Sequence, residues 1–120
     1  MLQEERRRFP RYHTPASFTA AGEFSSHGEC CLKVIEMSID GLRFVTEKDV
    51  SREAVFSLSF GVTNKRGDAA RISALACIRW YVYNKEASLY TAGAQFLGLT
   101  QSDRELLKDF FETLEMRSGR

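Results

Sequence analysis

The longest regular pattern in the sequence is an alternation at residues 70–83 that is typical of a β-strand. Every second side chain is apolar, and most of the side chains between them are charged, polar or aromatic. The apolar set consists of Ile72, Ala74, Ala76, Ile78, Trp80 and Val82. A strand of this length usually bends around a barrel. The same alternation predicts that Trp80 lies in the core.

Shorter stretches on either side of this strand have the same β character, and polar turns separate them. We expect strands at residues 16–24, 31–35, 42–45, 54–60, 70–83 and 87–97. Gly93, inside the last strand, predicts a bulge or a close approach of two backbones. With 120 residues and 43% hydrophobic content, the chain is expected to form one globular domain.

The last part of the sequence changes from strand to helix periodicity. Thr100 or Ser102 can cap a helix, and each is followed three positions later by an acidic residue. The apolar residues that then share one helical face are Leu106, Leu107, Phe110, Phe111 and Leu114. We expect a helix at about residues 101–116 that covers an open end or edge of the sheet, or that pairs with another chain in a homodimer. The predicted fold is dominated by β-structure, as a six-stranded antiparallel barrel with a C-terminal α-helix.

A basic stretch at residues 5–12 is the densest chemical feature of the chain. Its four arginines, interrupted by Pro10, are Arg6, Arg7, Arg8 and Arg11. A guanidinium group presents a rigid fork of donors that matches phosphate oxygens and the O6/N7 edge of guanine. The formal net charge is only +1, so any basic function is local. Taken alone, a basic run of this kind more often forms a solvated terminus, so a partner motif has to decide whether it binds a ligand. With such a partner, we predict a flexible arginine-rich ligand-binding arm at residues 1–15, and a barrel with its helix at residues 16–120.

A second motif, Glu-Met-Ser-Ile-Asp-Gly, occupies residues 36–41 between two predicted strands. Ser38 and Asp40 are residue types that bond to their own backbone in turns, and Gly41 suits a position of positive φ. The motif therefore predicts a tight six-residue hairpin loop. Arg43 follows this loop, and its direction is left open.

The arginine arm and this loop, in this order around two strands, resemble the signature of the PilZ domain family. The matching residues are Arg6, Arg7, Arg11, Glu36, Ser38 and Gly41. Residues 90–97 also resemble the closing strand of that family. The resemblance implies a PilZ-like split barrel that binds the bacterial second messenger cyclic di-GMP, as a receptor rather than an enzyme. It implies no cofactor, and a signal passed to an unknown protein partner when the ligand orders the arm.

The resemblance also implies roles for individual residues. Arg7 and Arg11 are expected to contact the phosphates and guanines, and Arg6 to favour a stacked pair of ligand molecules. Ser38 is expected to bond to a guanine edge or a phosphate through its hydroxyl group, whereas Gly41 sets the backbone of the loop.

Glu36 departs from the family pattern, in which this position is usually Asp or Asn. Either carboxylate accepts the N1 and N2 hydrogens of guanine, but the added methylene group of Glu36 moves the oxygens. Asp40 is an alternative acceptor. A domain of the same fold that has lost ligand binding, and serves as a protein-interaction adaptor, is therefore a second hypothesis.

Other kinds of site fit the sequence less well. One alternative is a small barrel that binds single-stranded nucleic acid. Trp80, Tyr81 and Tyr83 of the long strand could stack bases, and the basic arm could contact the backbone. The predicted burial of Trp80 weakens this hypothesis. Ser38, Asp40 and His13 lack the sequence context of a hydrolytic triad.

Cysteine usage favours a reducing compartment. His27, Cys30, Cys31 and Cys77 lack metal-ligand spacing, and three cysteines without a disulfide framework suit the cytoplasm. No apolar run has the length of a signal peptide core or a membrane span, so we expect a cytoplasmic protein without membrane association.

Overall fold

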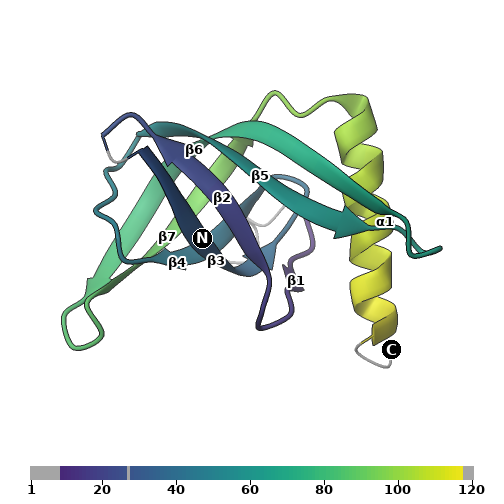
Figure 1. Cartoon of the computed structure of the whole chain (residues 1–120), viewed down its shortest axis with the longest axis horizontal. Coiled ribbons are helices and arrows are strands. Elements are labelled where there is room, and N and C mark those ends of the chain that lie inside the picture. The colour runs from purple at the N-terminus through teal and green to yellow at the C-terminus, as the bar shows by residue number, and fades with distance from the viewer. Residues whose placement is uncertain (1–8, 27, 118–120) are drawn as a thin grey trace, which may run out of the picture.

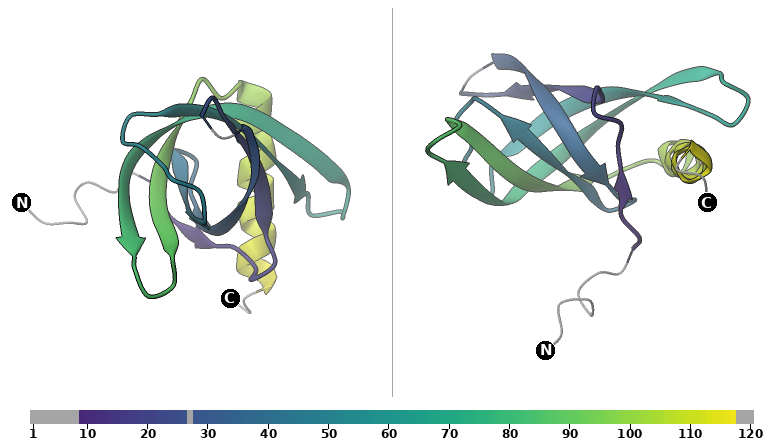
Figure 2. Two further views of the ribbon diagram at one scale, coloured as in Figure 1. Left: turned by 60° about the vertical axis from the view of Figure 1, so that its left-hand side comes forward. Right: turned by 90° about the horizontal axis from the view of Figure 1, so that it is seen from below.

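The computed structural model describes residues 9–26 and 28–117, which form seven strands and one helix (Figure 1). In chain order they are β1 (Tyr12–His13), β2 (Thr19–Phe24), β3 (Gly28–Met37), β4 (Gly41–Thr46), β5 (Val55–Thr63), β6 (Ala69–Asn84), β7 (Leu89–Leu97) and α1 (Gln101–Arg117). The strands form a ring in the left view of Figure 2, and the right view shows α1 beside that ring.

Six of the strands close into an antiparallel barrel in the order β3-β2-β5-β6-β7-β4, and the pairing of β4 with β3 completes the circle. The short β1 is an additional strand. It pairs with the end of β3, Tyr12 opposite Met37 and His13 opposite Glu36, beyond the part of β3 that pairs with β2. The predicted six-stranded antiparallel barrel with a C-terminal helix is therefore confirmed.

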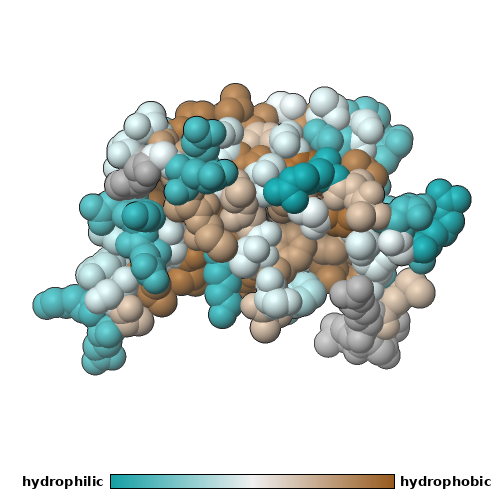
Figure 3. All heavy atoms as spheres, in the orientation of Figure 1, coloured by the Kyte–Doolittle hydropathy of each residue, from teal (hydrophilic) through white to brown (hydrophobic). Residues whose placement is uncertain are grey.

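Alternating side chains of the strands fill the interior of the barrel. The largest fully buried side chains are Phe44, Phe56, Phe60, Leu32, Met37, Ile72, Ile78 and Leu107. Aromatic rings pack directly on one another, as Phe24 and Phe56 do with centroids 4.4 Å apart. On the face shown in Figure 3, hydrophilic side chains gather at the tips of the β5–β6 and β6–β7 hairpins, and apolar side chains lie between them. The fold thus rests on one continuous apolar core.

A β-bulge in β6 overturns the prediction that Trp80 lies in the core. Ile78 pairs with Ala94 and Trp80 with Gly93, so Arg79 is an extra residue in β6. An extra residue reverses the alternation that follows it. The bulge turns Trp80, which is 42% exposed, away from the face of the fully buried Ile78. Tyr81 and Tyr83 are exposed as well, so the whole end of β6 after Ile78 lies outside the core. The close approach predicted at Gly93 does occur, but to a side chain: a Cβ at Gly93 would collide with Nε1 of Trp80.

The connection between β3 and β4 is shorter than the sequence predicts, because β3 continues to Met37 and β4 begins at Gly41. Gly41 does not have the predicted positive φ; among the described glycines that conformation occurs at Gly28, Gly67 and Gly98. A Cβ at Gly41 would instead collide with the carbonyl oxygen of Ala94. Glycine is needed here because β4 and β7 approach closely.

Helix α1 packs its apolar stripe against β5 and β1. The hydroxyl oxygen of Thr100 accepts the N–H of Asp103 at 3.0 Å, which confirms Thr100 as the cap. The ring of Tyr12 stacks on Phe111 with centroids 4.5 Å apart. Burial, together with the carboxylates of Glu115 and Glu112, raises the pKa of Tyr12. In the described part of the chain, no helix is long and apolar enough to cross a membrane.

We predict that Gly41→Ala lowers the free energy of unfolding by about 2 kcal/mol, because the new methyl group forces β4 away from the backbone of β7. Urea unfolding followed by circular dichroism measures the change. Gly61→Ala is the matched control, since Gly61 also lies in a strand and its added Cβ would meet neighbours only at ordinary contact distances of 3.8 Å or more. Equal losses in the two variants would contradict the steric explanation.

Candidate functional site

A cleft of about 250 Å³ lies where β4 closes the barrel. The β3–β4 turn, the start of β4, the bulge of β6 and the facing part of β7 form its walls, and Arg11 approaches from the start of β1. The lining residues are Arg11, Glu36, Met37, Ser38, Asp40, Gly41, Leu42, Arg43, Arg79, Trp80, Gly93, Ala94 and Gln95. Three arginines face two carboxylates in this set, so the lining carries a local excess of positive charge.

Glu36 lies at the centre of the charged part of the cleft. Its Oε2 is 3.2 Å from Nη2 of Arg43 and 3.8 Å from Nη1 of Arg11. Arg43 is brought there because it pairs with Glu36 across β3 and β4, and Arg11 because β1 pairs with the end of β3. Glu36 is only 8% exposed. A carboxylate this buried needs partners, and the two guanidinium groups supply them.

A second bulge, at residue 35 of β3, aims Glu36 into the cleft. Val34 pairs with Phe44 and Glu36 with Arg43, so the residue between them in β3 has no paired residue in β4. With strict alternation Glu36 would share the inward face of Val34. The bulge gives that place to Met37, which pairs with Leu42 and is buried, and turns Glu36 to the face that Arg43 occupies.

Arg43 has one donor without a partner. Its Nε is buried and makes no hydrogen bond to any residue that the structure describes. A buried N–H left unpaired costs about 1 to 3 kcal/mol, so an acceptor from water or from another molecule would stabilise this place. The sequence left the direction of Arg43 open, and the structure turns it to the cleft.

The β3–β4 turn is held by its own backbone and by Ser38. The N–H of Ser38 donates to the carbonyl of Gly41 at 2.8 Å, and the hydroxyl oxygen of Ser38 accepts the N–H of Asp40 at 3.1 Å. The carbonyl of Asp40 accepts the N–H of Phe96 at 2.8 Å. The predicted backbone bond of the Ser38 side chain is therefore present. It leaves the hydroxyl hydrogen of Ser38 available to another acceptor.

Two cleft residues that the sequence did not reveal come from the bulge of β6. Arg79 and Trp80 are consecutive, yet both line the cleft because the bulge interrupts the alternation. The sequence indicated this bulge only through Gly93, a glycine inside a predicted strand. The indole of Trp80 lies against Gly93.

The structure brings Arg11, Glu36, Ser38 and Gly41 together at this cleft. Arg6 and Arg7, the other predicted ligand-binding residues, lie outside the described residues. His27, one of the rejected metal-site residues, also lies outside them.

Within the described ranges, no group of three or more His, Cys, Asp or Glu residues is placed to hold a metal ion. The three cysteines are free thiols in different surroundings: Cys31 is exposed, Cys30 half-buried and Cys77 buried. Burial is the main cause of the raised pKa of Cys30.

Comparison with solved structures finds the same fold in several bacterial proteins. The PilZ domain of YcgR from Escherichia coli with c-di-GMP aligns with a TM-score of 0.71 at 14% identity, over 94% of this chain and 94% of that chain. The MrkH–c-di-GMP complex from K. pneumonia aligns with a TM-score of 0.74 at 18% identity, over 96% of this chain and 55% of that chain. The inhibitor of motility MotI/DgrA from Bacillus subtilis aligns with a TM-score of 0.72 at 13% identity, over 94% of this chain and 51% of that chain. This chain thus spans about half the length of the latter two proteins.

At these identities the likeness to solved structures shows the fold alone, and a search of curated proteins finds no significant match. The sequence itself is more informative, because it matches the PilZ domain over residues 5–113. Since that match covers most of the 120 residues, the chain belongs to the PilZ domain family.

Proposed function

We propose that this protein is a receptor for cyclic di-GMP. The observation that carries the proposal is the cleft beside the β3–β4 turn, which gathers Arg11, Glu36, Ser38 and Gly41 around a shared space. Two of the structurally similar proteins, YcgR and MrkH, were solved with c-di-GMP, which supports the same ligand here.

The side chains of the cleft match the groups that cyclic di-GMP offers. Its two phosphates need cationic donors, and Arg11 and the unpaired Nε of Arg43 supply them. Its guanines carry N1 and N2 hydrogens, for which Glu36 and Asp40 are acceptors. The half-exposed ring of Trp80 offers a flat surface for stacking at the rim.

The contact between Arg11 and Glu36 suits a site that changes on binding. At 3.8 Å, with the Arg11 side chain 46% exposed, this is the looser of the two ion pairs of Glu36, and the pair with Arg43 at 3.2 Å remains if Arg11 moves. We infer that a ligand phosphate takes over Arg11 and that Arg6 and Arg7 join it, so that the arm becomes ordered on the ligand. Arg6 would then favour a stacked pair of ligand molecules.

The output of such a receptor is a protein contact in the cytoplasm, not a chemical reaction. The features that support this proposal are the receptor character of the family and a cleft built from ion pairs and turn bonds. The downstream partner belongs to whatever process the second messenger controls.

One observation favours a second candidate function, the binding of single-stranded nucleic acid. Trp80, Tyr81 and Tyr83 are all more than 40% exposed along β6, and exposed aromatic rings on a small barrel can stack bases. The exposure of Trp80 removes the objection that the sequence raised. Fluorescence polarisation with labelled oligonucleotides tests this candidate directly.

We predict that Arg11→Lys weakens binding of cyclic di-GMP by about tenfold, because lysine keeps the charge but loses the planar fork. Arg7→Lys is expected to act in the same direction. Calorimetry measures the affinity and the number of molecules bound. Arg66→Lys is the matched control, since the side chain of Arg66 is 84% exposed in the β5–β6 turn, outside the cleft.

The same titrations with cyclic di-AMP test whether guanine is read. Adenine presents a donor where guanine presents O6, so each mismatched contact is expected to cost about 1 to 3 kcal/mol. Equal affinity for the two dinucleotides, with equal effects of the Arg11 and Arg66 substitutions, would show diffuse charge attraction and remove the receptor proposal.

We predict that Glu36→Asp holds or improves the affinity for cyclic di-GMP, and that Glu36→Ala reduces it by about fivefold or more through loss of the guanine acceptor. Calorimetry on both variants, with thermal unfolding as a check on folding, separates binding from stability. An unchanged affinity in Glu36→Ala would exclude Glu36 as the acceptor and direct the next substitution to Asp40.

A further inference from the structure

Arg79 is a cation in the cleft that belongs to neither sequence motif. It lines the cleft from β6, because the bulge places it on the same side as Trp80. Bulges commonly re-aim a side chain beside a binding site. A guanidinium group at this place needs an explanation that core packing does not give, since Arg79 is exposed.

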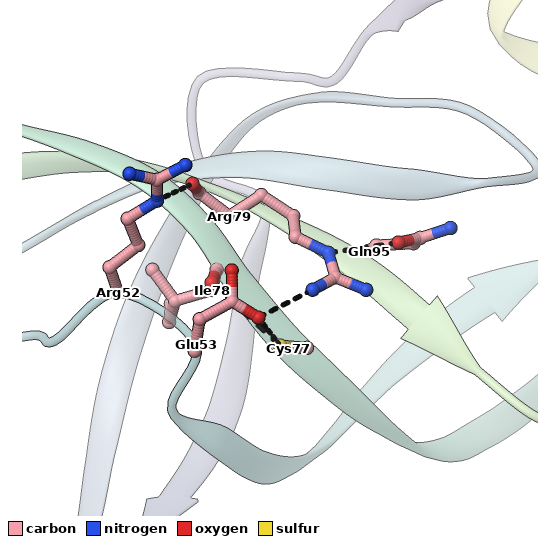
Figure 4. A network of polar contacts seen from close by, with 6 residues as sticks. All are labelled: Arg52, Glu53, Cys77, Ile78, Arg79 and Gln95. Carbon is pink, nitrogen blue, oxygen red and sulfur yellow. Dashed lines mark hydrogen bonds and ion pairs between the residues drawn. The ribbon is translucent and has the colours of Figure 1, made fainter.

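The guanidinium group of Arg79 is held from two sides (Figure 4). Its Nε donates to Oε1 of Gln95 at 2.9 Å, and its Nη1 donates to Oε1 of Glu53 at 2.7 Å. Gln95 itself lines the cleft from β7. The structure records no hydrogen bond from Nη2 of Arg79 to any described residue, and Figure 4 shows this nitrogen pointing away from both partners. Arg79 is thus oriented, but it keeps donors to spare.

Glu53 is positioned by a segment that docks on the bulge. The N–H of Glu53 donates to the carbonyl of Ile78 at 2.7 Å, and the N–H of Ile78 donates to the carbonyl of Ala54 at 2.9 Å. Arg52 Nε donates to the carbonyl of Arg79 at 3.2 Å. Glu53 has a φ of 69°, a left-handed conformation that is unfavourable for glutamate and persists only where surrounding contacts impose it. The backbone of Glu53 is therefore held beside the bulge, within reach of Arg79.

The Arg79–Glu53 ion pair is open to competition. The two side chains are 44% and 60% exposed, and ion pairs in such surroundings are weak and exchange readily. A phosphate oxygen competes for the same guanidinium hydrogens, whereas the bond to Gln95 at Nε keeps the group aimed at the cleft.

We propose that Arg79 is a further ligand-binding residue, which donates to a phosphate oxygen of cyclic di-GMP, and that Glu53 competes with the ligand for it and so sets the affinity of the site. The inference rests on the proposed function, because it names a contact within the same cleft. Gln95 acts as the positioning residue. Bidentate contact with a guanine edge through Nε and one Nη is disfavoured, because Nε is already bonded to Gln95.

The test compares variants of the two partners by calorimetry with cyclic di-GMP. Arg79→Ala is expected to weaken binding by about tenfold. Glu53→Gln is expected to tighten it by about twofold to fivefold, because the neutral amide holds Arg79 less strongly than the carboxylate does. In the double variant the gain from Glu53→Gln should vanish, since its target is gone. A pair with a structural role alone would make both single variants change affinity in the same direction.

Arg71→Ala is the matched control. Arg71 is another exposed arginine of β6, bonded to Ser59 Oγ at 3.1 Å and outside the cleft. The Arg71→Ala variant should bind cyclic di-GMP with the affinity of the wild type. Thermal unfolding checks that each variant folds. If Arg79→Ala is unfolded, Arg79→Lys, which keeps the charge and most of the side chain, takes its place with an expected loss of about threefold.

The possible outcomes distinguish a failure of the Arg79 inference from a failure of the receptor proposal. If the wild-type protein does not bind cyclic di-GMP, the proposed function fails and the inference with it. If the wild type binds and the Arg79 variant binds equally well, the receptor proposal stands and the ligand contact of Arg79 is overturned. If Glu53→Gln weakens binding as Arg79→Ala does, the pair supports the wall of the cleft, and competition by Glu53 is overturned.

Discussion

The closure of the barrel by β4 is the constraint on which the rest of the structure depends. This short strand pairs with β3 along one edge and with β7 along the other, and without it the sheet would remain open. The approach of β4 to β7 is so close that Gly41 has no room for a side chain. Because the cleft lies on this same seam, the walls of the site are held by the hydrogen bonds that close the fold.

Two bulges turn a regular barrel into one with a charged cleft. An unbroken alternation would place Glu36 inward with Val34, and Arg79 and Trp80 on opposite faces. The extra residue in β3 and the extra residue in β6 change both arrangements, and the displaced side chains line the same cleft. Each bulge leaves the core filled, since Met37 and Ile78 take the buried positions.

Sequence periodicity predicts strands and buried side chains correctly where the alternation is regular. It predicts the wrong face for side chains that follow a β-bulge. The alternation as far as Ile78 predicted the buried side of the long strand correctly. Residue type narrowed the helix cap to Thr100 or Ser102, and only the structure decides for Thr100. The burial of Trp80 was predicted wrongly, because a bulge depends on which strand lies alongside. For the same reason Arg79 was missed, and Gly41 was assigned a turn conformation although its role is to admit a neighbouring strand.

Two consecutive residues at the start of β1 contact different parts of the molecule. Arg11 reaches the carboxylate of Glu36 in the cleft, and its immediate neighbour Tyr12 lies with its ring flat on Phe111 of the helix. Directly after Arg11, β1 is fastened to β3 by two residue pairs, Tyr12 with Met37 and His13 with Glu36. A force that draws Arg11 toward a ligand therefore acts about a fixed pivot, and we expect it to be transmitted as a tilt or slip of the Tyr12 ring across α1. The helix surface, rather than the distant hairpin tips, would then be where a second molecule senses that the cleft is occupied.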